Sequence, residues 1–160
     1  MSTYQPSLQA GGGSIMVWGA IQGERTVPLF RVTGTLKAPA YTEILNVRLI
    51  PWITEAEGLI FQQVNASCHT ARLTKNYLQL NDITVMDWPP YSPDLNPIEN
   101  LWSHLKRELN NTRISGLNNL FATAELLFSS IPSQTVKKLV ESMPSRIAQV
   151  IKNKGGHTSY

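Results

Sequence analysis

The chain has 160 residues, enough for one domain, and its 42% hydrophobic and 16% charged residues exclude an intrinsically disordered protein. No apolar run approaches the roughly 20 residues of a membrane span, and residues 1–10 contain no signal-peptide core, so we expect no membrane partner. The net charge is +3, and Cys68 is the only cysteine, which excludes an internal disulfide and makes a reducing compartment the simpler assumption.

The first third of the chain predicts a leader, a hairpin and a helix. Residues 1–13 contain no apolar run and end in three glycines, so we expect a flexible leader. Two stretches rich in β-forming residues, 14–21 and 26–32, predict an antiparallel hairpin. Residues 39–56 have helical apolar spacing, with a kink expected at Pro51.

The remaining elements alternate between strands and helices before the chain becomes entirely helical. Short apolar stretches predict strands, and longer stretches with helical apolar spacing predict helices. The predicted strands are 59–64 and 83–86, and the predicted helices are 70–80, 97–109, 117–128, 133–142 and 144–152. This order predicts an α/β fold in which helices cover a mixed sheet.

A proline-rich segment precedes the helix at 97–109. Four prolines within nine residues, 89–97, exclude helix and sheet interior and predict a rigid loop. Asn96 and Pro97 suit a helix start, and Glu99 lies where a capping box has its acid. On this pattern alone a capped helix is the more common explanation, and a functional role for Glu99 stays open.

Basic residues gather near the C-terminus. Residues 133–160 contain five of them, Lys137, Lys138, Arg146, Lys152 and Lys154, against the single acid Glu141. Such a segment suits a phosphate backbone, although solvated surface lysines give the same pattern. We name these five residues as candidates for DNA binding.

Several motifs together are specific. They are GGGSIMVWG at 11–19, FQQ at 61–63, CHTA at 68–71, WPPYSPDLNPIE at 88–99, VESMPSRI at 140–147 and KGGH at 154–157. In this order, from about Gly11 to Tyr160, they resemble the Tc/mariner superfamily of cut-and-paste DNA transposases.

The resemblance implies an RNase H-like fold and a DDE active site, in which three acidic residues bind two Mg²⁺ or Mn²⁺ ions. The third acid corresponds to Glu99. The second corresponds to position 64, because 34 residues lie between it and Glu99, which is the family's spacing. Position 64 is Val64, which cannot bind a metal ion. We therefore expect Glu99 alone to be insufficient and no metal to be bound.

The first acid of the family lies on a central first strand upstream of the glycines. No acidic residue precedes Glu24 in this sequence, so we expect that acid and its strand to be missing. The resulting expectation is a leader at 1–13, an N-terminally truncated RNase H-like core at 14–110 and a C-terminal helical extension at 111–160. With the central strand missing, the isolated protein should be marginally stable and prone to associate.

The resemblance implies a fragment of a transposase DDE domain, ancestrally cleaving and transferring DNA in the nucleus and here inactive. Two alternatives stay open: a retained nucleic-acid-binding module, and a protein that forms oligomers or associates with full-length transposase and interferes with it. Other sites are weaker. Cys68, His69, His104 and His157 lack zinc-ligand spacing, and Asp87 and Asp94 are better explained as turn residues than as a glycosidase pair.

Overall fold

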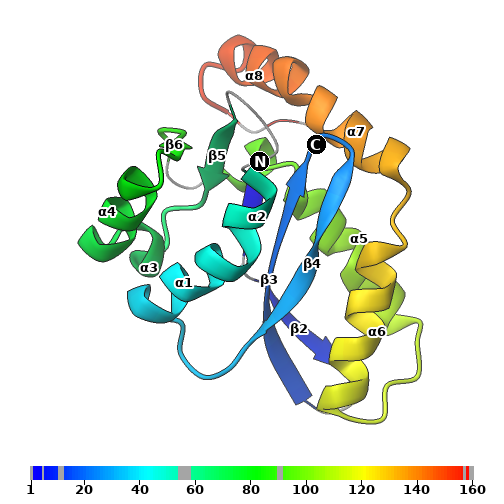
Figure 1. The fold of residues 1–160 in the computed structure, drawn as a ribbon. Helices are drawn as coiled ribbons and strands as arrows, with labels where there is room; N and C mark the ends of the chain where they lie inside the picture. The colour runs from blue at the N-terminus through cyan, green and yellow to red at the C-terminus, as the bar shows by residue number, and fades with distance from the viewer. Residues whose placement is uncertain are drawn as a thin grey trace.

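The computed structural model describes residues 2–4, 6–10, 13–53, 59–89, 92–156 and 158. Its centre is a six-stranded mixed sheet in which β3 pairs with β4 on one side and with β2 and β1 on the other. Beyond β1 the sheet continues through β5 to β6, and helices lie on both faces (Figure 1). The predicted α/β architecture is confirmed.

The predicted hairpin is formed by β3 (Gly13–Gln22) and β4 (Arg25–Val32), which pair antiparallel. Gly23 lies in the turn between them with φ of 58°, a left-handed conformation that glycine adopts without steric cost. Residues 17–21 of β3 are all buried, because this part of the strand is covered by helices on both faces of the sheet.

The prediction of a flexible leader is wrong for most of residues 1–13. β1 (Ser2–Tyr4) and β2 (Ser7–Ala10) both pair antiparallel with β3 in one continuous register, from Ser2 opposite Ile21 to Ala10 opposite Gly13. Between them the Pro6 carbonyl accepts a hydrogen bond from the Val17 amide at 3.2 Å. Proline lacks an N–H group but retains its acceptor, so it does not interrupt this side of the ladder.

The predicted gap at the centre of the sheet is also filled. β1 pairs in parallel with β5 (Ile60–Gln63), with Ser2 beside Gln62 and Thr3 beside Gln63. A short polar segment can occupy this central place because backbone groups make the ladder, whatever the side chains. The expectation of a missing central strand is therefore corrected: residues 2–4 occupy that position, although without an acidic residue.

The helices beside β5 lie on one face of the sheet. The helix predicted at 39–56 is α1 (Ala38–Ile44), a π-helical segment η1 (Leu45–Leu49) and α2 (Ile50–Ile53). Residues 54–58 lie outside the described part. The helix predicted at 70–80 divides into α3 (Ser67–Thr70) and α4 (Arg72–Leu80), and the strand that follows is β6 (Thr84–Val85), parallel to β5.

The second half of the chain covers the other face. A 3₁₀ turn, η2 (Pro93–Leu95), precedes α5 (Ile98–Asn110), and α6 (Leu117–Ser129), α7 (Ser133–Glu141) and α8 (Met143–Lys152) follow. These helices match the predicted ranges to within one residue at either end. Among the described residues, none forms a helix long and apolar enough to cross a membrane.

Two hydrophobic cores lie on opposite faces of the sheet. One combines sheet residues such as Val17 and Leu8 with α5, α6 and α7, and the other combines Trp18 and Phe61 with α1 and α4. Leu120 and Phe128 of α6 share the first core with Trp102 of α5. The helices α6 and α7 therefore contribute to the same core as the sheet.

Candidate active site

Position 64 directly follows the C-terminal end of strand β5, where the predicted site lies. Phe61 packs in the core beneath α1, and Gln63 faces the same side, where its Oε1 accepts a 2.7 Å hydrogen bond from the Tyr41 hydroxyl. Side chains alternate along a strand, so Gln62 belongs to the opposite face, and Val64 follows directly after the strand. The Val64 side chain is half-buried and supplies no oxygen or nitrogen ligand.

A buried histidine fixes the backbone at this position. The Nδ1 atom of His69 lies 2.7 Å from the Val64 carbonyl oxygen, which can only accept, so Nδ1 carries the proton. The imidazole is 1% exposed and stacks on Tyr41, with ring centroids 4.3 Å apart. Burial lowers the pKa of His69, which favours the neutral ring. The hydrogen bond from His69 thus fixes the backbone at Val64.

The strand register shows which residue of β1 ends next to the end of β5. Thr3 lies beside Gln63, the last residue of β5, and residue 4 is the last residue of β1. Residue 4 is a tyrosine, so neither neighbouring strand end carries a carboxylate. This correspondence is not apparent from the sequence, in which residues 1–13 have the composition of a leader.

Glu99 lies in the first turn of α5, the predicted position, and its amide donates to the Asn96 carbonyl at 3.1 Å. Burial raises the pKa of its carboxyl group to about 7, and the positive charge of Lys106 opposes this effect. Its neighbours Ile98, Leu101 and Trp102 are buried and anchor the helix against the sheet. Glu99 is thus a partly buried carboxyl group whose protonated form is favoured by its surroundings.

These residues do not fit a two-metal centre. Of positions 4, 64 and 99, only the last offers an acidic oxygen ligand. Within the described ranges, no group of three or more His, Cys, Asp or Glu side chains could bind a metal ion. Three carboxylates would be needed to offset the charge of two divalent cations in such proximity.

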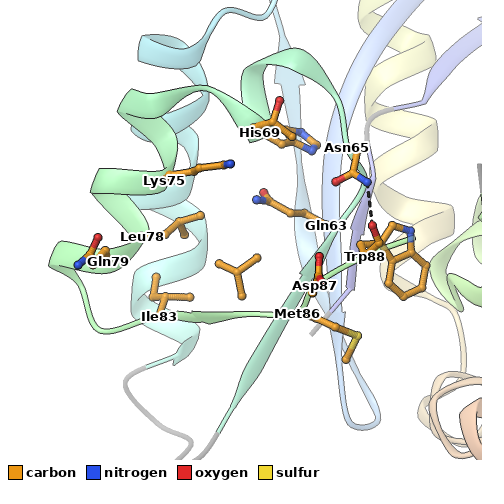
Figure 2. Close-up of a pocket in the computed structure, with 12 residues that line it drawn as sticks. Gln63, Asn65, His69, Lys75, Leu78, Gln79, Ile83, Met86, Asp87 and Trp88 are labelled. Atoms are coloured by element: carbon orange, nitrogen blue, oxygen red, sulfur yellow. Dashed lines mark hydrogen bonds between the residues drawn. The ribbon is translucent and has the colours of Figure 1, made fainter. Parts of the chain in front are cut away.

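A separate pocket of about 450 Å³ lies on the other side of β5, at the ends of β5 and β6 (Figure 2). Figure 2 shows the side chains of Gln63 and Lys75 pointing toward each other across it. The amide of Asn65 donates to the Trp88 carbonyl at 2.9 Å and thereby joins the two loops that follow the strands. No pattern in the sequence indicates this pocket, because its walls come from segments that are separate in the chain.

The basic residues predicted to bind DNA divide into two groups. Lys137, Lys138, Lys152 and Lys154 are exposed and available to a phosphate backbone. Arg146 is 0% exposed, and its guanidinium donates hydrogen bonds to Ser142, Asp94 and Asn100. The structure therefore removes Arg146 from the predicted DNA-binding set.

The weaker candidate sites also have structural explanations. Cys68 is buried, and this burial raises the pKa of its thiol, which disfavours the thiolate that metal binding requires. His104 lies against Arg107 and Glu108 on the surface of α5, and within the described ranges it belongs to no group of three or more possible metal ligands. The carboxylate of Asp94 accepts a 2.8 Å hydrogen bond from the amide of Thr158, as a turn residue would.

Comparison with known proteins identifies relatives of this chain. Residues 4–120 match the DDE superfamily endonuclease family. The Tcb1 transposase of Caenorhabditis briggsae is 41% identical over 160 residues, and the Tc1 transposase of Caenorhabditis elegans is 37% identical over 160 residues. Both alignments cover 98% of this chain but 59% of the relative, so the chain spans less than two thirds of either transposase.

Solved structures share the fold. The catalytic domain of the Mos1 mariner transposase matches with a TM-score of 0.88 at 18% identity, over 98% of this chain and 82% of that one. The structure of the Mos1 catalytic domain with Raltegravir and Mn matches with a TM-score of 0.88 at 18% identity, over 98% of this chain and 83% of that one. The structure with Raltegravir and Mg matches with a TM-score of 0.87 at 19% identity, over 98% of this chain and 84% of that one. The RNase H-like fold is thereby confirmed. With the match to the family over most of its length, this chain belongs to the DDE superfamily of endonucleases, among the Tc/mariner transposases.

Proposed function

We propose that this chain is a transposase DDE domain that binds DNA but does not cleave it. The observation that carries the proposal is Val64, the residue that the resemblance assigns to the position of the family's second metal-binding acid. A valine side chain cannot replace a carboxylate as a ligand for a hard cation such as Mg²⁺. The absence of an acid at residue 4, the end of the strand that pairs with β5, supports the same conclusion.

Loss of the metal pair would remove the chemistry on which the family's reaction depends. Two divalent ions activate the attacking oxygen and stabilise the charge that develops during phosphoryl transfer. Glu99 alone has no second carboxylate with which to bind such a pair. Purified protein should therefore show no Mg²⁺- or Mn²⁺-dependent cleavage of transposon-end DNA, and Val64→Asp alone should not restore it. Metal-dependent nicking by the wild-type protein that Glu99→Gln abolishes would contradict the proposal.

The DNA-binding part of the proposal rests on the four exposed lysines of α7, α8 and the segment after α8. Such a surface should bind DNA without sequence preference, with a dissociation constant on the order of 10⁻⁴ to 10⁻⁶ M at physiological salt. A DNA-binding role of this kind in a eukaryotic cell would place the protein in the nucleus.

Salt dependence tests this assignment. Lys137→Gln with Lys138→Gln should make the plot of log affinity against log salt concentration shallower by about 0.9 for each phosphate that the protein no longer neutralises. The matched control is Lys37→Gln with Lys75→Gln, which removes the same charge from exposed positions beside the opposite face of the sheet. An equal change in the control, or an affinity that does not respond to salt, would show that the C-terminal lysines are only solvated surface.

A further inference from the structure

Arg146 is a fully buried arginine that connects three separate segments. Its Nε donates to the Ser142 hydroxyl at 2.8 Å, at the start of its own helix. One terminal nitrogen donates to the Asp94 carbonyl at 2.6 Å, in the 3₁₀ turn η2. The other donates to the Asn100 side-chain oxygen at 2.8 Å, in the first turn of α5. A buried guanidinium is costly unless its donors are used, so this geometry is strongly specified.

The two distant partners lie on either side of Glu99 in the sequence. Asp94 comes five residues before Glu99, and Asn100 comes directly after it. Asp94 is fixed a second time, because its carboxylate accepts the 2.8 Å hydrogen bond from the Thr158 amide. Arg146 and Thr158 therefore both contact the loop that leads into α5, and Arg146 also contacts the turn that carries Glu99.

We infer that Arg146 is a positioning residue for Glu99. Its hydrogen bonds to Asp94 and Asn100 connect α8 to the turn that carries Glu99, and they thereby fix the position of the third acid of the site. The inference rests on the assignment of Glu99 to that position, and it is independent of whether the chain binds DNA. It also explains why Arg146 does not lie on the surface with the neighbouring lysines.

Arginine suits this task and lysine does not. The guanidinium presents its donors in a fixed planar fork, which matches three acceptors that lie in different directions. An ammonium group is a point charge on a flexible stem and cannot reproduce that fork. Arg146→Lys therefore keeps the charge while removing part of the geometry, which makes it the informative substitution.

Amide hydrogen exchange of the full chain tests the inference. The amides of Glu99 and Asn100 bond to the carbonyls of Asn96 and Pro97, at 3.1 and 3.3 Å, and report on the first turn of α5. In Arg146→Lys the exchange of these two amides should accelerate by about tenfold or more, because each hydrogen bond from a charged donor shifts a local opening equilibrium by about that factor. The amides of α6 and β3 should change much less. Lys152→Met, at an exposed position of the same helix, should leave both regions unchanged.

Asn100→Ala removes the acceptor of the hydrogen bond from Arg146. It therefore tests the inference even where Arg146→Lys fails to fold. It should accelerate exchange of the Glu99 amide in the same way, and the double variant should add little to either single one. The inference is overturned by unchanged exchange in the first turn of α5 in the folded variants. It is also overturned by an equal acceleration in α6 and β3, since that result would mean a general loss of stability.

Discussion

At the scale of single residues, the site combines retained geometry with lost chemistry. His69 fixes the backbone at position 64, and Arg146 fixes the turn that carries Glu99. On the proposed assignment, two of the three ligand positions lack an acid, because they hold Val64 and Tyr4. Glu99 then remains as a partly buried carboxyl group.

Glu99 should therefore make folding stability depend on pH. Its carboxyl has a pKa of about 7 in the folded chain and near 4.5 when unfolded, so the folded state binds the proton more tightly. Stability from this group is fully present below pH 4.5 and is lost as pH rises through 7. Glu99→Gln should flatten that decline, measured by urea unfolding between about pH 5 and 8.

The matched control for this experiment is Glu108→Gln, at a more exposed position on the same helix. It should leave the pH profile of the wild-type protein unchanged. A wild-type profile that already coincides with that of Glu99→Gln would show that the Glu99 carboxyl titrates normally.

His69 should contribute to stability through its bond to Val64. His69→Phe can retain the stacking on Tyr41 but leaves the Val64 carbonyl without this donor, which should cost about 1–3 kcal/mol in the free energy of unfolding. Thr70→Ala, at the exposed neighbouring position, should cost much less. Equal stabilities of the His69→Phe variant and the wild-type protein, compared by urea unfolding, would show that the bond is unimportant.

At the scale of elements, α5 approaches β3 closely at a glycine. A Cβ atom on Gly19 would lie 2.7 Å from the Trp102 ring and 2.8 Å from the Leu29 side chain. The Trp102 ring cannot easily retreat, since it stacks on Phe128 of α6 with centroids 4.9 Å apart. The absence of a side chain at residue 19 is thus what allows the acid-bearing helix to lie against the sheet.

Gly19→Ala should destabilise the protein by about 1–3 kcal/mol, because the added methyl group overpacks this contact. Thermal unfolding monitored by tryptophan fluorescence measures the effect. Ser14→Ala, at an exposed position of the same strand, serves as the control and should change stability by less than about 0.5 kcal/mol. A Gly19→Ala variant as stable as this control would contradict the close contact.

At the scale of the whole molecule, the N-terminal residues complete a sheet that was expected to be open at its centre. Pairing of β1 with both β3 and β5 removes the two unpaired edges from which marginal stability and association were expected. Leu8 of β2 is fully buried in the core with Val17 and Leu101. We now expect residues 1–160 to unfold cooperatively.

Leu8→Asp tests that contribution. An unpaired carboxylate in the core should cost about 3–5 kcal/mol and should free β1 and β2 from β3, so the variant should associate in sedimentation velocity experiments. Gln9→Asp, at the exposed neighbouring position of the same strand, should remain like the wild-type protein. Identical sedimentation and melting of the two variants would mean that residues 2–10 are not part of the fold in solution.

Long, periodic elements were more predictable from the sequence than short or polar ones. α5 was predictable because Ile98, Leu101, Trp102, Leu105 and Leu109 recur at helical spacing after a proline-rich turn. β1 was not, because three polar residues form a strand only through backbone pairing with partners distant in the chain. Arg146 was assigned to the surface for a similar reason: its helical position alone does not reveal that Asp94 and Asn100 would lie around it.

We propose that the site of this chain lacks two of the three metal ligands of a DDE centre. Titration with Mn²⁺, followed by electron paramagnetic resonance, tests this central claim without requiring any activity. The wild-type protein and Val64→Asp should show no saturable binding. Tyr4→Asp combined with Val64→Asp should bind Mn²⁺, because β1 and β5 are neighbouring parallel strands and each strand end would gain a carboxylate, and adding Glu99→Gln should weaken that binding. Saturable Mn²⁺ binding by the wild-type protein that Glu99→Gln abolishes would contradict the claim.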